Sequence, residues 1–120
     1  MSPAVNPIKS CLVEITPGRH QGQRVMRLSG PLVEETIFDF QNQMRVESAP
    51  AVVIDMSDVP YMDSAGLGSL VLAAVHFNKS GRRLALAGMN ERAVTLFQMS
   101  HLDRFFTTYP NRTAAEEALK

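Results

Sequence analysis

A hydroxyl group that another protein could modify lies in residues 54–68, IDMSDVPYMDSAGLG. The pattern predicts a buried strand that ends at Asp55 and, after a short loop, a helix that opens at Asp63 or Ser64. In open α/β sheets, sites usually lie at the carboxyl ends of parallel strands. The Ser64 hydroxyl should therefore lie near solvent, and small residues surround it on the following turn: Ala65, Gly66 and Gly68.

Phosphorylation is the chemistry that this arrangement favours. A phosphate on Ser64 would add about −1.5 to −2 charges at neutral pH. The free N–H groups and the macrodipole at a helix start tolerate an anion, whereas Asp63 would repel it. We therefore expect the fold to survive modification, while a partner packed against this surface would lose its fit.

Three alternatives for the same residues stay open. Ser and Asp before a helix are ordinary N-caps, and the glycines could serve only close packing of the helix on the sheet. Asp55, Asp58 and Asp63 offer oxygen ligands to a hard metal ion, although Asp58 is typical of a solvated turn and Asp63 of a helix cap.

Other catalytic and cofactor signals are absent from the sequence. His20, His76 and His101 do not have the spacing of metal ligands, and Cys11 has no cationic neighbour in sequence to lower its pKa. No phosphate-binding glycine loop or nucleophile elbow is present. We therefore expect no enzyme activity, catalytic residue, metal or cofactor.

The surrounding elements predict an α/β domain. Residues 11–16 and 24–29 alternate like two half-buried strands of a hairpin, and 51–55 and 84–87 read as buried strands. The spacing of Val33, Ile37, Phe40 and Met44 predicts one face of a first helix, and a second helix is expected to begin at Asp63 or Ser64 and to end just before Gly81. Further helices are expected around residues 93–97 and over 112–119, with a last strand at 105–109. This order predicts a mixed, mostly parallel sheet of about five strands, opening with an antiparallel hairpin and flanked by four helices.

Composition limits the partners. The 120 residues carry twelve basic and twelve acidic side chains, which provides no basic surface for nucleic acid and no polybasic strip for a membrane. With one cysteine and no signal peptide or long apolar run, the chain is expected in the cytoplasm. We expect a flexible segment over residues 1–10, one domain over 11–120 and a monomer.

The segment DMSDVPYMDSAGLG, residues 55–68, resembles the signature of STAS domains of bacterial anti-sigma-factor antagonists. The strand GRRLALAG (81–88) and the helix RAVTLFQMSHL (92–102) extend the likeness over nearly the whole chain from Cys11. In one place the sequence departs from the family: Gly30-Pro31-Leu32-Val33 has valine where an aspartate is frequent, which leaves kinase docking open, although Glu34 or Glu35 could compensate.

The resemblance implies a partner-switching cycle. The unphosphorylated protein would bind an anti-sigma factor that is also a serine kinase, phosphorylation of Ser64 would release it, and a metal-dependent serine phosphatase would reset it. The partner surface is expected to comprise Glu34, Tyr61, Met62, Asp63, Ala65, Gly66 and Leu67. The alternative is a STAS subunit of a membrane transporter, such as a lipid-trafficking ATPase, that needs no phosphorylation.

Overall fold

The computed structural model describes residues 10–120, along which strands and helices alternate. In chain order they are β1 (Leu12–Pro17), β2 (Gln23–Ser29), α1 (Ile37–Val46), β3 (Ala51–Asp58), α2 (Ser64–Lys79), β4 (Arg83–Ala87), α3 (Glu91–Met99), β5 (Thr108–Tyr109) and α4 (Arg112–Ala118). The predicted order of elements is confirmed. The flexible segment predicted over residues 1–10 lies, apart from Ser10, outside the described residues.

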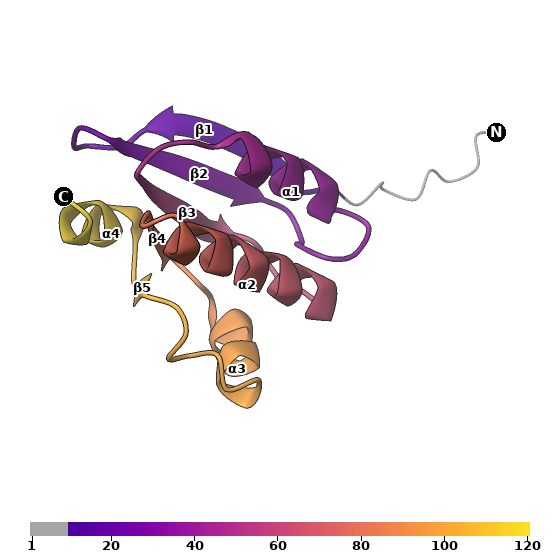
Figure 1. Ribbon diagram of the computed structural model, residues 1–120. Helices are drawn as coiled ribbons and strands as arrows, with labels where there is room; N and C mark the ends of the chain where they lie inside the picture. Colours follow the sequence, from indigo (N-terminus) through magenta and orange to yellow (C-terminus); the bar gives the residue numbers. More distant parts are fainter. Residues whose placement is uncertain (1–9) are drawn as a thin grey trace.

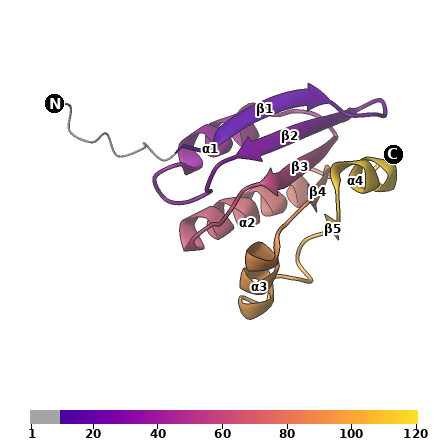
Figure 2. The same ribbon diagram turned by 180° about the vertical axis from the view of Figure 1, so that it is seen from behind.

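The strands form one mixed sheet in the order β1-β2-β3-β4-β5. The β1–β2 hairpin is antiparallel, and the remaining pairs are parallel. Figure 1 shows α1 and α2 side by side across one face of the sheet, and Figure 2 shows α4 against the other face. Because β2, β3 and β4 are parallel, their carboxyl ends meet at one edge, where α2 begins.

Two apolar clusters hold these layers together. The larger lies between the sheet and α1, α2 and α3, and its fully buried members include Leu28, Phe40, Ile54, Leu70 and Phe97. The smaller cluster lies between the sheet and α4. Val25, Val53 and Ala85 of the sheet pack there against Ala115 and Leu119. None of the helices within residues 10–120 combines the length and apolar character needed to span a bilayer.

The segment before α1 differs from the prediction. Val33 does not belong to the helical face of Ile37, Phe40 and Met44, because α1 begins only at Ile37. The Thr36 hydroxyl accepts a hydrogen bond from the Val33 N–H at 2.9 Å and donates one to the Pro31 carbonyl oxygen at 2.6 Å. These bonds fold the segment back on itself, and Val33 is buried ahead of the helix.

Two strand boundaries were also wrong. β3 runs to Asp58 instead of ending at Asp55, because a register shift in β2 lets Ser29 pair with Asp58. Asp58 is exposed, as expected of a solvated residue, but it ends a strand instead of lying in a turn, and it forms an ion pair with Arg27. β5 is only Thr108–Tyr109, since a turn from Leu102 to Phe105 directs Phe106 into the core, 5.1 Å from the ring of Phe97.

Polar contacts fasten α4 to the β1–β2 hairpin. The buried Glu116 carboxylate accepts a hydrogen bond from the Arg19 N–H at 2.7 Å and contacts Arg112 Nε at 3.4 Å. The Gln23 side chain donates to the Glu116 carbonyl oxygen at 2.7 Å. Glu117, one residue further on, makes its bond to His20 at the surface.

We expect Glu116→Ala to lower the free energy of unfolding by about 1.5–3 kcal/mol, the usual cost of losing hydrogen bonds to a buried charged group. Urea denaturation measures the change. Glu117→Ala is the matched control, because it removes an exposed ion pair that contributes little. Equal losses in the two variants would contradict the structural role of Glu116.

Candidate functional site

The candidate site is the first turn of α2, where Ser64 is the first helical residue and is exposed. Of the two N-caps that the sequence allowed, Asp63 and Ser64, the structure has Asp63: its Oδ1 accepts a hydrogen bond from the Gly66 N–H at 2.9 Å. Among residues 10–120, no group forms a hydrogen bond with the Ser64 hydroxyl. The hydroxyl therefore stands in solvent at a helix end whose geometry the neighbouring carboxylate fixes.

The Asp63 carboxylate also connects two separate segments of the chain. Its Oδ2 accepts a hydrogen bond at 3.1 Å from the N–H of Glu34, a residue of the segment that precedes α1. Partial burial alone would raise the pKa of Asp63, but the backbone N–H groups of Gly66, Glu34 and Ala65 favour the ionised form and hold its pKa below the ordinary value. The ionised Asp63 side chain thus caps α2 and also holds Glu34 against it; we call this pair of hydrogen bonds the Asp63 clamp.

Backbone contacts join the same two segments over a longer stretch. The Gly30 N–H donates to the Asp58 carbonyl oxygen at 3.0 Å, and the Leu32 N–H donates to the Tyr61 carbonyl oxygen at 3.1 Å. Leu32 and Met62 form an isolated parallel bridge. The loop that leads to Ser64 therefore continues the β2–β3 pairing beyond the sheet, which restricts its freedom to move.

The two glycines of the first turns of α2 have different surroundings. A Cβ on Gly66 would lie less than 3.0 Å from the Leu32 carbonyl oxygen, a backbone atom that cannot easily move aside. A Cβ on Gly68 would meet no atom of residues 10–120 within 4 Å. Gly66 thus permits the close contact with residues 30–36, whereas Gly68 leaves open space one helical turn from Ser64.

The start of α3 supports the loop from its other side. The Asn90 side chain donates to the carbonyl oxygens of Val59 at 3.2 Å and Pro60 at 3.0 Å. The same side chain caps α3 by accepting from the Ala93 N–H at 2.9 Å. The Arg92 guanidinium lies 5.6 Å from the centre of the Tyr61 ring, a cation–π contact beside the site.

The residues predicted for the partner surface lie together but differ in exposure. Ser64 and Glu34 are exposed, and Tyr61, Met62, Asp63 and Ala65 are half-buried. Gly66 and Leu67 are buried, so their side of the helix serves packing and they could affect a partner only by positioning the exposed residues. The acidic position that the family pattern suggested holds the buried Val33, and the exposed Glu34 side chain is the neighbouring carboxylate.

The acidic residues considered as metal ligands are engaged separately. Asp55 accepts hydrogen bonds from the Ser57 N–H at 3.0 Å and from its hydroxyl at 2.7 Å, Asp58 pairs with Arg27, and Asp63 caps α2. In the part of the chain that the structure describes, no three acidic, histidine or cysteine residues are grouped to hold a metal ion. Cys11 is buried, and burial raises the pKa of its thiol.

Two contacts at the site had no recognisable signal in the sequence. Asn90 could be identified as a helix cap from its place before residues 91–99, but its bonds to the loop before Ser64 depend on tertiary structure. The Leu32 carbonyl is a backbone group and leaves no trace in residue type; only Gly66 indicated that some close approach takes place there.

Two sequence comparisons relate this chain to known proteins. The sequence profile of the STAS domain family matches residues 14–115. The anti-sigma F factor antagonist of Paenibacillus polymyxa is 27% identical over 107 residues, covering 86% of this chain and 92% of that protein.

Two solved structures share the fold. The anti-sigma factor antagonist of Mycobacterium paratuberculosis has a TM-score of 0.82 at 24% identity, covering 95% of this chain and 97% of that one. The phosphorylated form of the Bacillus cell fate determinant SpoIIAA has a TM-score of 0.66 at 15% identity, covering 89% of this chain and 99% of that one.

We expect Gly66→Ala and Gly68→Ala to change stability in opposite directions. The Gly66 substitution forces a methyl group against the Leu32 carbonyl and should cost about 1–3 kcal/mol. The Gly68 substitution adds a better helix former in open space and should stabilise by up to about 1 kcal/mol. Urea unfolding of both variants tests the pair, and a Gly66→Ala protein as stable as the wild type would refute the close contact.

The clamp at Asp63 predicts a pH dependence. Because folding lowers the pKa of Asp63 from its ordinary value of 3.8, its stabilising effect should be complete above that pH and be lost as the pH falls through the lower pKa of the folded state. The difference in unfolding free energy between wild type and Asp63→Asn should therefore shrink on acidification. Denaturant titrations at neutral and acidic pH measure it, and a difference that grows in acid would contradict the clamp.

Proposed function

This chain belongs to the STAS domain family, and we propose that it acts in the cytoplasm as an anti-sigma-factor antagonist switched by phosphorylation of Ser64. The observation that carries the proposal is the exposed Ser64 hydroxyl on a firmly held first helical turn, with the open space at Gly68 beside it. The names of its relatives support the antagonist role. In this scheme, the chain is a substrate and a binding partner, and no residue of it catalyses a reaction.

The modification is a phosphoryl transfer to Ser64. Its Oγ attacks the γ-phosphorus of ATP held by a partner kinase, the new O–P bond forms as the bond to ADP breaks, and a base of the kinase takes the hydroxyl proton. A metal-dependent serine phosphatase reverses the state by adding water across the Oγ–P bond. The fold admits this chemistry because the hydroxyl is exposed and is not needed as the helix cap, a role that Asp63 fills.

Charge explains why the modification would end binding. A phosphate brings about −1.5 to −2 charges to a turn that already presents the Asp63 and Glu34 carboxylates. None of the ion pairs within residues 10–120 involves either of these two groups. The helix N-terminus tolerates the new charge within the molecule. A partner packed against the first turn would instead face a larger, hydrated and strongly negative surface.

The partner we propose is an anti-sigma factor with serine kinase activity. The unphosphorylated chain would bind it through Ser64, Gly68 and the half-buried side chains of Tyr61, Met62 and Ala65, and so release the sigma factor. Val33 is buried where an aspartate is frequent in the family, so we assign to the exposed Glu34 the acidic contact with the kinase.

The decisive variants are Ser64→Ala and Ser64→Asp. We expect Ser64→Ala to bind the kinase constitutively and Ser64→Asp to bind at least tenfold more weakly, because the carboxylate places a permanent negative charge on the contact surface. Isothermal titration calorimetry with the purified kinase measures both, and intact-mass and fragment analysis of the native protein tests for one reversible phosphate on Ser64.

Ser48→Asp is the matched control, since it places the same charge on an exposed serine in the loop before β3. Its affinity should equal that of the wild type. Equal binding of Ser64→Ala and Ser64→Asp would remove the switch. A native protein that never carries phosphate and co-purifies with a membrane ATPase would instead identify the chain as a transporter subunit.

A further inference from the structure

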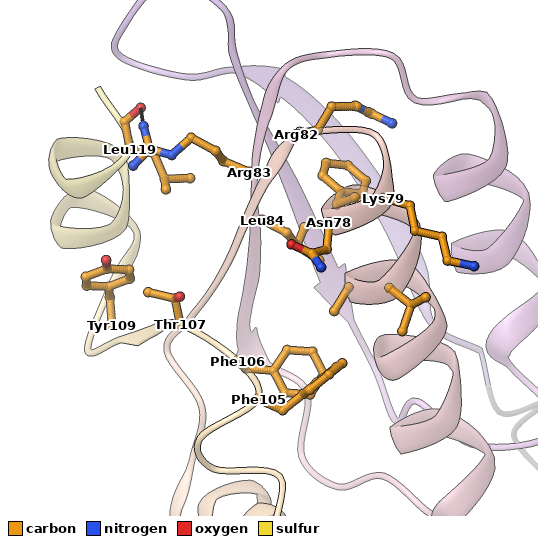
Figure 3. A pocket seen from close by; sticks show the side chains of 13 residues that line it. Asn78, Lys79, Arg82, Arg83, Leu84, Phe105, Phe106, Thr107, Tyr109 and Leu119 are labelled. Carbon is orange, nitrogen blue, oxygen red and sulfur yellow. Dashed lines mark hydrogen bonds between the residues drawn. The ribbon is translucent and has the colours of Figure 1, made fainter.

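A second site lies at the opposite end of α2 from Ser64. A cavity of about 490 Å³ opens between the last turns of α2, β4, residues 105–109 and the end of α4 (Figure 3). At about 1.5 Å per helical residue, it is roughly 20 Å from Ser64 along α2. We propose that this cavity binds a small amphipathic organic anion, with an apolar body and one carboxylate, sulfonate or phosphate group.

The cavity exists because β5 covers only part of the sheet edge. β5 pairs with β4 through Leu86 and Ala87 alone, and the chain then turns at Pro110 toward α4. Within the described part of the chain, Leu84 and the beginning of β4 therefore have no neighbouring strand on that side. The volume is within the range of small-molecule sites, about 300–1,000 Å³.

Apolar side chains line the lower part of the cavity. Phe106 is buried and Phe105 is 48% exposed, so one ring continues the core and the next presents an edge to the opening. The two rings meet at 84° with centroids 5.2 Å apart. Leu84 and Ala74 complete this surface from β4 and α2. It suits an aromatic or branched aliphatic body.

The charge of the lining is one-sided. Lys79, Arg82 and Arg83 contribute to it, and among residues 10–120 no aspartate or glutamate does. Arg82 donates to the carbonyl oxygens of Ala49 at 2.9 Å and Glu47 at 2.8 Å. These bonds hold the guanidinium toward the loop before β3, 3.9 Å from the centre of the Phe77 ring, and Figure 3 shows it extending away from the opening. Like Lys79, Arg82 therefore adds charge to the cavity only at longer range. In a protein of zero net charge, this is a local excess of positive charge.

Arg83 is the cation best placed for the ligand's anionic group. Its guanidinium donates to the carbonyl oxygens of Leu119 and Ala118 at the C-terminal end of α4, both at 3.1 Å, and none of the ion pairs within residues 10–120 involves it. Figure 3 shows Arg83 extending toward Leu119 on one side of the cavity and Asn78 on the other, with Phe105 and Phe106 at the lower end. Lys79 extends away from the opening in this view and adds charge only at longer range.

A pair of fluorescent probes tests the chemistry. 8-Anilinonaphthalene-1-sulfonate carries the expected aromatic body and one sulfonate, and N-phenyl-1-naphthylamine has the same body without the charge. We expect the sulfonate to bind one site per chain at least tenfold more tightly than the neutral probe. Its affinity should also fall as salt is raised, whereas that of the neutral probe should not.

Matched variants locate the site. Ala74→Phe fills the cavity from α2 and should weaken binding of the sulfonate at least tenfold, whereas Leu72→Phe, on the same helix but facing the groove between α1 and α2, should not. Arg83→Gln should abolish the preference for the charged probe, and Arg45→Gln, in that other groove, should preserve it.

Amide chemical shifts in a titration of the wild type should change around Leu84 and Thr107. Equal affinity for the two probes, shifts gathered around Met44 and His76, or unchanged binding to Ala74→Phe would each overturn the proposal. If Arg83→Gln loosens α4, as a lowered melting temperature would show, the salt dependence in the wild type decides the charge requirement. None of these outcomes depends on Ser64 or its kinase.

Discussion

The approach of the Leu32 carbonyl oxygen to Gly66 is the contact on which the geometry of the site depends. A Cβ at position 66 would lie less than 3.0 Å from the Leu32 carbonyl oxygen, so only glycine lets the segment before α1 lie against the first turn of α2. Once the two segments are in contact, the Leu32 N–H reaches the Tyr61 carbonyl and the Glu34 N–H reaches the Asp63 carboxylate. A side chain at position 66 would separate the segments and weaken all of these bonds together.

The same turn has a second side that takes no part in this packing. Ser64 is exposed and Gly68 has open space around it, whereas Gly66 and Leu67 are buried beneath them. The N-terminus of a helix stabilises a nearby anion by about 0.3–1 kcal/mol. The hydrogen bonds that Asp63 makes to the Gly66 and Glu34 N–H groups do not involve the Ser64 side chain. A phosphate there acts on what approaches from outside, so binding can change while the fold is retained.

The sequence predicted those features that depend on local chemistry. The order of elements, the antiparallel hairpin and the Asp63 cap followed from alternation, helical spacing and capping preference. The errors lie where tertiary contacts decide: Val33 has helical spacing but is withdrawn by Thr36, Asp58 is drawn into β3 by its pairing with Ser29, and Phe106 turns inward against Phe97 instead of extending β5. Asn90 was not singled out in the sequence: its position before α3 is a capping signal, but its contacts with Val59 and Pro60 depend on tertiary structure.

The distribution of charge along α2 connects its two ends. Carboxylates gather at the N-terminus, where Asp63 and Glu34 lie, and Lys79, Arg82 and Arg83 gather near the C-terminus. Both groups lie where the helix macrodipole favours their sign. The side-chain charges named at the two ends of the helix are therefore opposite in sign, within a chain of zero net charge. A phosphate on Ser64 adds to a surface that is already negative, so its effect on a partner is repulsive from the start, whereas a free organic anion is drawn to the other end of the same helix. The charges at the two ends of α2 therefore suit different events: phosphorylation of Ser64 at one end and binding of an organic anion near Arg83 at the other.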